Sequence, residues 1–221
     1  MNFKNVGGQL MTLNGYAVNI ENFIADKNNY VDNIIVLNKL DRATLVHSRN
    51  VLKLSKMLGK AVGLNSAQMK DLHMGALFHD VGKVFIPKKI LNNTDKLTDE
   101  EFEIMKTHSK LGYEYMKDNS NLSDESLKII LEHHERSDGK GYPDNKTNDE
   151  LSILSKIVSV CDVYDALVSK RSYKKAFSIE KAIEILNDAK GSQLDENLVD
   201  LLCCKVVPLL SKCDDVTCNP S

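Results

Sequence analysis

The sequence predicts an all-α fold for this chain of 221 residues. Through most of the chain, apolar residues recur at the three- and four-residue spacing of amphipathic helices. Residues that commonly cap helix N-termini, such as Asn65, Thr98 and Ser178, stand directly before these stretches. No segment shows the convincing apolar–polar alternation expected of a half-buried strand. We therefore expect a bundle of helices without a sheet.

The first two helices are delimited by glycines and by a capping residue. Apolar periodicity predicts a helix over residues 30–58, and Gly59 and Gly63 are expected to end it. The next helix follows the N-cap residue Asn65 and stops at Gly82.

A loop and several further helices complete the expected domain. Residues 84–97 contain Pro87 and are interpreted as a loop. Thr98 opens a capping box, and Phe102 of the helix that follows is expected to face inward. The remaining helices are predicted at residues 99–117, 124–135, 152–169, 178–186 and 195–206.

These elements divide the chain into a partly ordered N-terminal extension (residues 1–35), one domain (36–210) and a C-terminal tail (211–221). Hydrophobic residues make up 42% of the chain, which is enough for a substantial core. The formal net charge is -2, so the chain lacks the basic excess of proteins that coat polymeric nucleic acid. No run of about 18 apolar residues predicts a membrane helix, and no secretory block follows the N-terminus. We expect a cytoplasmic protein without a membrane partner.

The five cysteines do not indicate a disulfide framework, because their number is odd and two are adjacent. The four near the C-terminus match no common zinc spacing, so reduced thiols are the preferred interpretation. They are Cys203, Cys204, Cys213 and Cys218.

Histidines carry the chemistry that the sequence suggests. Five of the six fall on apolar helix faces or at the ends of apolar helices, namely His47, His79, His108, His133 and His134. A single inward histidine is usually an ordinary core residue, and His73 is interpreted in this way because it lies about 10 Å along the helix from Asp80. Neutral imidazoles beside carboxylates are the ligands that first-row transition metals prefer. Five such histidines together predict a metal site.

Two aspartates in an otherwise apolar helix extend this cluster. Asp162 and Asp165 are three residues apart and share one helix face, so both can point into the same site. A buried carboxylate is costly unless it is paired or bound to a metal. A pair of helix-terminal caps or salt bridges remains the alternative explanation.

Two polar segments near these residues suggest a binding site. Residues 137–150 contain Gly139 and Gly141, whose backbone freedom permits turns close to a ligand, so this loop is expected to form a wall of the site. Residues 170–175 are rich in Lys and Arg and could be a solvated turn or a phosphate clamp, since Arg171 offers bidentate donors.

Taken together, these motifs resemble the HD-GYP branch of the HD superfamily. The resemblance rests on His79-Asp80-Val81-Gly82-Lys83 and on the run from His133 to Pro143, which contains His-His-Glu-Arg and Asp-Gly-Lys-Gly-Tyr-Pro. It covers residues 40–207 and implies an HD-domain-like helical bundle with a metal centre in its core.

The resemblance also implies roles for individual residues. It assigns His108, His133 and His134 to one metal, and His47, His79 and Asp162 to the other, with Asp80 bridging the two. Lys83 is placed near the scissile phosphate and Tyr142 in the loop. Asp165, Arg171 and Lys174 are placed along the substrate site, with the two cations on phosphate oxygens.

The implied activity is hydrolysis of cyclic di-GMP to pGpG or onward to GMP, with iron or manganese as the metal. In this mechanism a hydroxide held with Asp80 between two metal ions attacks phosphorus in line. Lys83 and Arg171 stabilise the phosphate oxygens, and Asp165 orients the water or the substrate. Members with three metals carry a Glu where this chain has Ala43, and the nearest acid, Asp41, lies on another face, so two metals are expected.

Other functions remain open on the sequence alone. The same site could act on a different cyclic dinucleotide, such as cyclic GMP-AMP, or on a nucleotide phosphomonoester. The domain could also be a non-catalytic sensor of cyclic di-GMP that reports to a partner. A homodimer or a regulatory partner protein is compatible with either function.

Overall fold

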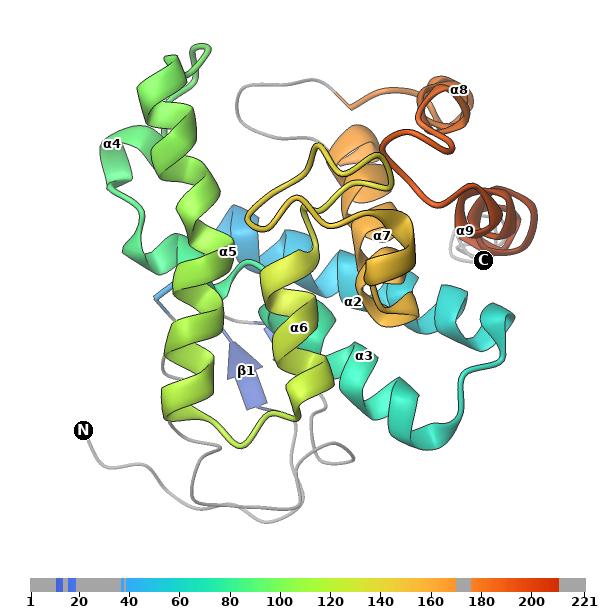
Figure 1. Ribbon diagram of the computed structural model, residues 1–221, viewed down its shortest axis with the longest axis horizontal. Coiled ribbons are helices and arrows are strands. Elements are labelled where there is room, and N and C mark those ends of the chain that lie inside the picture. The colour runs from blue at the N-terminus through green and yellow to red at the C-terminus, as the bar shows by residue number, and fades with distance from the viewer. Residues whose placement is uncertain (1–10, 14–15, 19–36, 38, 170–175, 211–221) are drawn as a thin grey trace, which may run out of the picture.

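The structure is a computed structural model that describes residues 11–13, 16–18, 37, 39–169 and 176–210. Helices dominate this part of the chain, so the predicted all-α fold is confirmed (Figure 1). The N-terminal extension adds a small antiparallel ribbon of β1 (Met11–Leu13) and β2 (Tyr16–Val18), in which Met11 lies opposite Val18.

Helix α2 (Arg42–Val62) begins later and ends later than the sequence predicted. Its N-cap is Asp41, and Gly63 ends it with a left-handed φ of 86°, which glycine adopts without strain. Gly59 was wrongly expected to end the helix. It lies inside α2, where a Cβ atom would stand 2.7 Å from Leu72, so its role is to let the next helix approach closely. Residues 30–36 lie outside the described part of the chain.

Helix α3 (Ser66–Phe78) follows α2. Asn65 caps α3, as predicted, and the structure adds a reciprocal capping box with Gln68. A short 3₁₀ turn, η1 (Val81–Phe85), follows directly, and α4 (Lys88–Leu91) forms after it. The prediction that residues 84–97 form a loop was therefore wrong for its first half, because Pro87 occupies the N-cap position of a helical turn instead of preventing one.

Helix α5 (Asp99–Asn119) begins at the Thr98 capping box, as predicted, and packs closely on η1. A Cβ atom at Gly82 would lie 1.9 Å from the carbonyl oxygen of His108, so only glycine permits this backbone contact. Phe102 was wrongly predicted to face inward. It is 47% exposed, because the first turns of α5 extend beyond the body of the domain (Figure 1).

The remaining α-helices follow the predicted order: α6 (Asp124–Glu132), α7 (Ile153–Val168), α8 (Ile179–Asp188) and α9 (Glu196–Leu201). The 3₁₀ turn η2 (Asn148–Glu150) lies in the segment predicted to be a loop, and the π-helical turn η3 (Leu202–Val206) follows α9 where one continuous helix was expected. The side chain of the preceding residue caps each of the four α-helices in this series, namely Ser123, Ser152, Ser178 and Asp195. Each oxygen accepts a backbone N–H of the first turn and so satisfies one otherwise unpaired donor.

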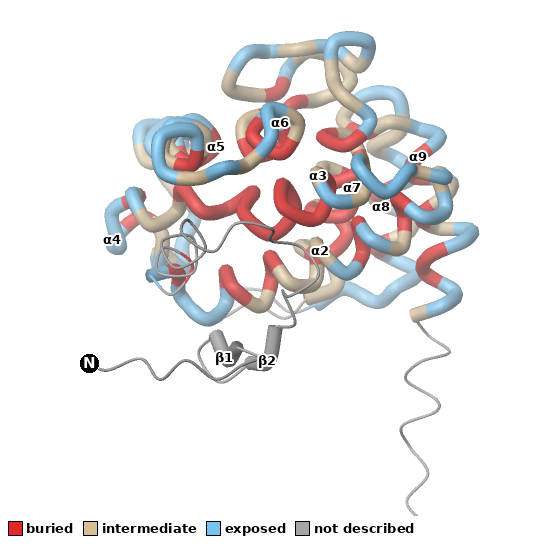
Figure 2. The backbone as a smooth tube through the Cα atoms, turned by 90° about the horizontal axis from the view of Figure 1, so that it is seen from below, coloured by how far each residue is buried: buried red, intermediate tan, exposed pale blue. Residues whose placement is uncertain are grey.

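Helix α2 packs on α3 and α7, α3 packs on α6, and α5 packs on η1 and α6. Buried residues gather along these helices, whereas α4 and the outer turns of α5 are largely exposed (Figure 2). Two apolar clusters form the core, and α2, α3 and α6 contribute to both. Close packing of this kind fixes the helix ends from which the site residues project.

Candidate metal centre

The structure brings together all seven residues that were predicted to bind metal. They project from α2, the end of α3, α5, the end of α6 and α7, and they are His47, His79, Asp80, His108, His133, His134 and Asp162. All are buried except His134, whose side chain is 27% exposed. Segments more than 100 residues apart in sequence therefore meet at one point.

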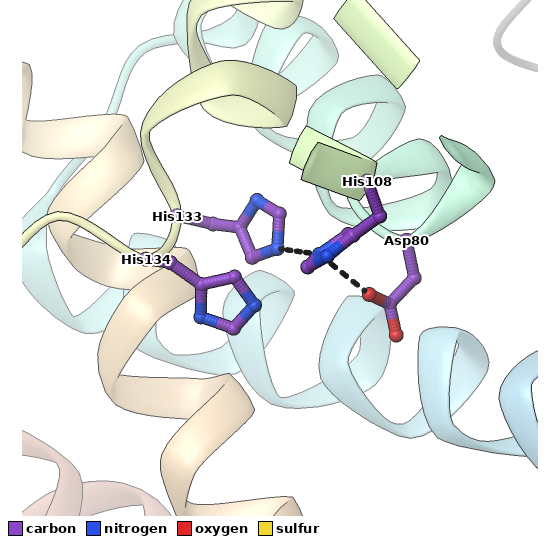
Figure 3. Close-up of side chains that lie close together, drawn as sticks. All are labelled: Asp80, His108, His133 and His134. Atoms are coloured by element: carbon purple, nitrogen blue, oxygen red, sulfur yellow. Dashed lines mark hydrogen bonds and ion pairs between the residues drawn. The ribbon is translucent and has the colours of Figure 1, made fainter. Parts of the chain in front are cut away.

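Within the described residues, six of these side chains form two groups that could each hold a metal ion, and Asp162 belongs to neither group. One contains Asp80, His108, His133 and His134, and the other contains His47, His79 and Asp80. In each group one potential ligand atom per residue lies within 4.8 Å of the others. Figure 3 shows the first group, with the three imidazoles and the Asp80 carboxylate directed toward one another. Because Asp80 belongs to both groups, it is placed to bridge them.

The histidine ring orientations fit metal binding. The Nδ1 atoms of His79, His108 and His133 donate to the carbonyl oxygens of the residues three positions earlier, at 2.8, 2.7 and 2.9 Å. Each imidazole is thereby held with its proton on Nδ1, which leaves an Nε2 lone pair. The Nε2 atoms of His108 and His133 face each other at 3.3 Å. Within the described part of the chain, the buried Nε2 of His79 has no hydrogen-bond partner. A cation would satisfy all three lone pairs.

The electrostatics keep this group in the form that metals require. Burial lowers the pKa of His108 to about 3 and that of His134 to about 4, so both are neutral at pH 7. Burial also lowers the pKa values of His79 and His133. Burial alone would raise the pKa of Asp80, yet the Lys83 ammonium beside it holds that pKa well below the usual value. The group of Asp80, His108, His133 and His134 thus combines neutral imidazoles with an ionised carboxylate.

His47 lies between two carboxylates of α7. Its Nε2 is 2.8 Å from Oδ1 of Asp162, and its Nδ1 is 2.6 Å from Oδ2 of Asp165. Burial lowers the pKa of His47, but the hydrogen bonds to these two carboxylates outweigh burial and raise it to about 9. The prediction that both aspartates point toward one site is met by this geometry, with Asp162 on the Nε2 side of the ring and Asp165 on the other.

Lys83 is the cation in contact with the cluster. Its Nζ donates to Oδ2 of Asp80 at 2.6 Å, from one helical turn further along the chain. The Lys83 side chain remains 18% exposed, whereas Asp80 is almost completely buried. This arrangement places a positive charge at the boundary between the buried carboxylate and solvent, where it could meet an anionic ligand.

The loop after His134 covers one side of the cluster, as predicted. The ring of Tyr142 lies 4.8 Å from that of His134 at an angle of 33°. Gly141 permits this path, because a Cβ atom there would stand 2.4 Å from the backbone of Glu135 and Arg136. Tyr142 therefore forms a wall of the site against His134.

Two buried glutamates that the sequence reasoning missed hold this loop. Glu135 accepts the backbone N–H groups of Asp144 at 2.6 Å and Lys146 at 3.1 Å. Glu132 accepts Lys146 Nζ at 2.7 Å and Ser155 Oγ at 2.7 Å. The sequence does contain a signal for these two residues. An acidic residue at the C-terminal end of a helix interacts unfavourably with the helix dipole, so it is expected to have a stabilising partner.

Comparison with known proteins agrees with this geometry. The family model described as "HD domain" matches residues 29–198. The chain belongs to the HD domain family. This HD domain is 34% identical over 163 residues to the "Cyclic di-GMP phosphodiesterase response regulator RpfG" of Xanthomonas campestris pv. campestris, covering 73% of this chain and 43% of that protein. It is 35% identical over 162 residues to the "3′3′-cGAMP-specific phosphodiesterase 2" of Vibrio cholerae, covering 73% of this chain and 31% of that protein.

A solved structure shares the fold of this HD domain. The protein from Bdellovibrio bacteriovorus described as an HDG"Y"P protein superposes with a TM-score of 0.64 at 21% identity, covering 86% of this chain and 60% of that one. The chain spans less than half the length of the two relatives named above. The HD-GYP resemblance is consistent with all three similarities. Among the described residues, no helix is long and apolar enough to cross a membrane.

His73, like Asp162, is in neither of the two candidate metal groups found among the described residues. Ala43 is exposed on α2, and the Asp41 carboxylate is occupied as an N-cap by the backbone and hydroxyl of Thr44. Arg171 and Lys174 lie outside the described residues, as do Cys213 and Cys218.

Proposed function

We propose that this HD domain is a metal-dependent phosphodiesterase that hydrolyses cyclic di-GMP to pGpG or GMP. The observation that carries the proposal is the convergence of imidazole Nε2 atoms on Asp80, which belongs to both candidate metal groups. The name of the Xanthomonas relative supports the choice of substrate.

Two divalent transition metals, iron or manganese, are the proposed cofactors. Imidazole and carboxylate ligands suit these ions. His108, His133 and His134 would hold one ion, His47, His79 and Asp162 the other, and Asp80 would serve both. When bound, the ions would stabilise negative charge on the phosphate and lower the pKa of a coordinated water.

The protein's own residues would position and neutralise the phosphate. Lys83 would donate to a non-bridging oxygen, since its ammonium stands at the exposed edge of the Asp80 carboxylate. Tyr142 would close one side of the site and restrict water near His134. Arg171 and Lys174 are retained as proposed phosphate contacts on the strength of the family resemblance.

Metal analysis coupled to hydrolysis tests this proposal. The protein is purified anaerobically, iron and manganese are counted per chain, and cyclic di-GMP and its products are followed by chromatography. We expect about two metals per chain and hydrolysis that is lost in Asp80→Ala. Asp118→Ala removes an exposed aspartate of α5 and should retain full activity. A metal-loaded wild-type protein without turnover would contradict the proposal and favour a sensor module.

A second candidate substrate is 3′3′-cGAMP, because one relative of similar identity is named for that activity. The two substrates share the phosphodiester ring and differ in one base, so the metal centre serves both equally. Turnover of cyclic di-GMP and 3′3′-cGAMP measured side by side with one preparation distinguishes them through the ratio of the two kcat/KM values.

A further inference from the structure

Four of the five clustered histidines, His47, His79, His108 and His133, have a hydrogen-bond partner at Nδ1, and the kind of partner differs among them. In His79, His108 and His133 the Nδ1 atom donates to a backbone carbonyl of the residue three positions earlier. His47 is the exception, because its Nδ1 meets the side-chain carboxylate of Asp165 at 2.6 Å. Asp165 thus occupies the place that backbone carbonyls occupy for the other three.

Both oxygens of Asp165 are engaged within the protein. Oδ2 faces His47, and Oδ1 accepts the hydroxyl of Ser169 at 2.8 Å. Ser169 in turn lies within 3.5 Å of the amide nitrogen of Asn50, one turn after His47 on α2. The Asp165 residue is only 3% exposed. The interactions join α2 to α7 on the side of the His47 ring that faces away from the other ligands.

We infer that Asp165 is a positioning residue that orients the His47 imidazole toward the metal centre, and that it does not contact the substrate. This inference rests on the proposed function and reassigns a residue that the family resemblance placed along the substrate site. Asp162, one turn earlier on α7, differs from Asp165. Its Oδ1 faces the His47 Nε2, on the side of the ring that is directed toward the candidate metal groups.

Physical reasons favour this role over a direct one. A carboxylate that receives Nδ1–H fixes the tautomer and the orientation of the ring, and it makes the ligand nitrogen more electron-rich. A buried carboxylate would also repel the phosphate oxygens of a cyclic dinucleotide at close range. Loss of such a partner typically weakens metal affinity about 10- to 100-fold. The effect should be confined to the metal held by His47.

Cobalt titration of the metal-free protein tests the inference. Co²⁺ binding is followed by visible absorption, and the cobalt retained after gel filtration is counted. The wild type should bind two equivalents. Asp165→Ala should keep one equivalent at wild-type affinity and bind the other about 10- to 100-fold more weakly. The affinity of Asp165→Asn for this second equivalent should lie between those of the wild type and Asp165→Ala. The amide oxygen of the asparagine can still accept the His47 Nδ1–H, and its amide nitrogen can donate to Ser169.

Three results would overturn the inference. If Asp165→Ala binds both equivalents like the wild type and changes only KM or kcat, Asp165 contacts the substrate. If both equivalents weaken together and the melting temperature falls, the role is a general structural one. If the wild type binds no cobalt, the metal centre itself is wrong. A wild type that binds two equivalents and hydrolyses no cyclic dinucleotide refutes the proposed function alone. Asp118→Ala, which alters an exposed aspartate of α5, is the control and should match the wild type.

Discussion

The pKa values of two buried histidines, His47 and His73, are shifted in opposite directions from the ordinary value. The Asp162 and Asp165 carboxylates outweigh burial and raise the pKa of His47 to about 9. His73 is also buried, but its charged neighbours are Lys56 and Lys60, so burial and repulsion together lower its pKa to about 4. The carboxylates around His47 therefore reverse the effect of burial on its pKa, whereas the lysines around His73 add to that effect.

The low pKa of His73 predicts a contribution to acid sensitivity. Its pKa is about 4 in the folded chain, against 6.5 for an unperturbed histidine, so the unfolded chain binds more protons between these values. The stability that this residue contributes is fully present above pH 6.5 and is lost as pH falls toward 4. In His73→Gln, the proton uptake on unfolding near pH 5 should fall by up to about one proton.

Urea midpoints measured from about pH 7 to pH 4.5 on both metal-free proteins check this prediction, since the slope of stability with pH reports the proton difference. The clustered histidines are present in both proteins and cancel in the comparison. An equal pH slope for wild type and variant would show that His73 does not titrate differently on folding.

At the scale of elements, the loop after α6 depends on glutamates that belong to the helix end. Glu135 is 2% exposed and accepts two backbone N–H groups, from Asp144 and Lys146. Glu132 pairs with the Lys146 ammonium. The path of the loop is therefore set by buried polar contacts, and Tyr142 is held over His134 as a consequence.

Glu135→Ala should release this loop while leaving the helices in place. Two backbone N–H groups lose a carboxylate acceptor, and a hydrogen bond to a charged group contributes about 1.5–3 kcal/mol. We expect unfolding free energy to fall by roughly 2–4 kcal/mol and amide hydrogen exchange to accelerate over residues 141–147. Glu114→Ala on the exposed face of α5 is the matched control. Unchanged exchange in the loop would show that other contacts hold it.

At the scale of the whole molecule, the sequence predicted the helices and pointed to the seven candidate ligands because both predictions rest on short local motifs. Capping residues such as Thr98 act within one turn, and the His79-Asp80 and His133-His134 pairs stand at helix ends. Features that depend on how helices meet were missed. Phe102 is exposed because α5 extends past its neighbours, and Gly59 lies within α2 because α3 packs against it.

The position of Asp165 is another feature that depends on how helices pack and that the sequence did not predict. Its spacing from Asp162 predicted a shared helix face, which the structure bears out. The spacing could not say that the His47 ring would lie between the two carboxylates, because that depends on where α2 crosses α7. The side of the His47 ring on which each aspartate lies is set by tertiary packing. The position of Asp165 in a motif therefore could not predict that side.

A metal centre assembled from α2, α3, α5, α6 and α7 should also stabilise the whole fold. The unfolded chain does not bring these ligands together, so metal binds the folded state selectively and adds about 2.7 kcal/mol at a free concentration one hundred times Kd. For a chain of this size, that corresponds to a melting temperature roughly 5–10 °C higher.

Chelation should remove this increase in melting temperature, and Mn²⁺ should restore it. Differential scanning calorimetry of the wild type, with Asp80→Ala as the variant expected to lose most of the response, measures the effect. Equal melting of loaded and stripped wild type would mean that the cluster holds no metal tightly enough to link these helices.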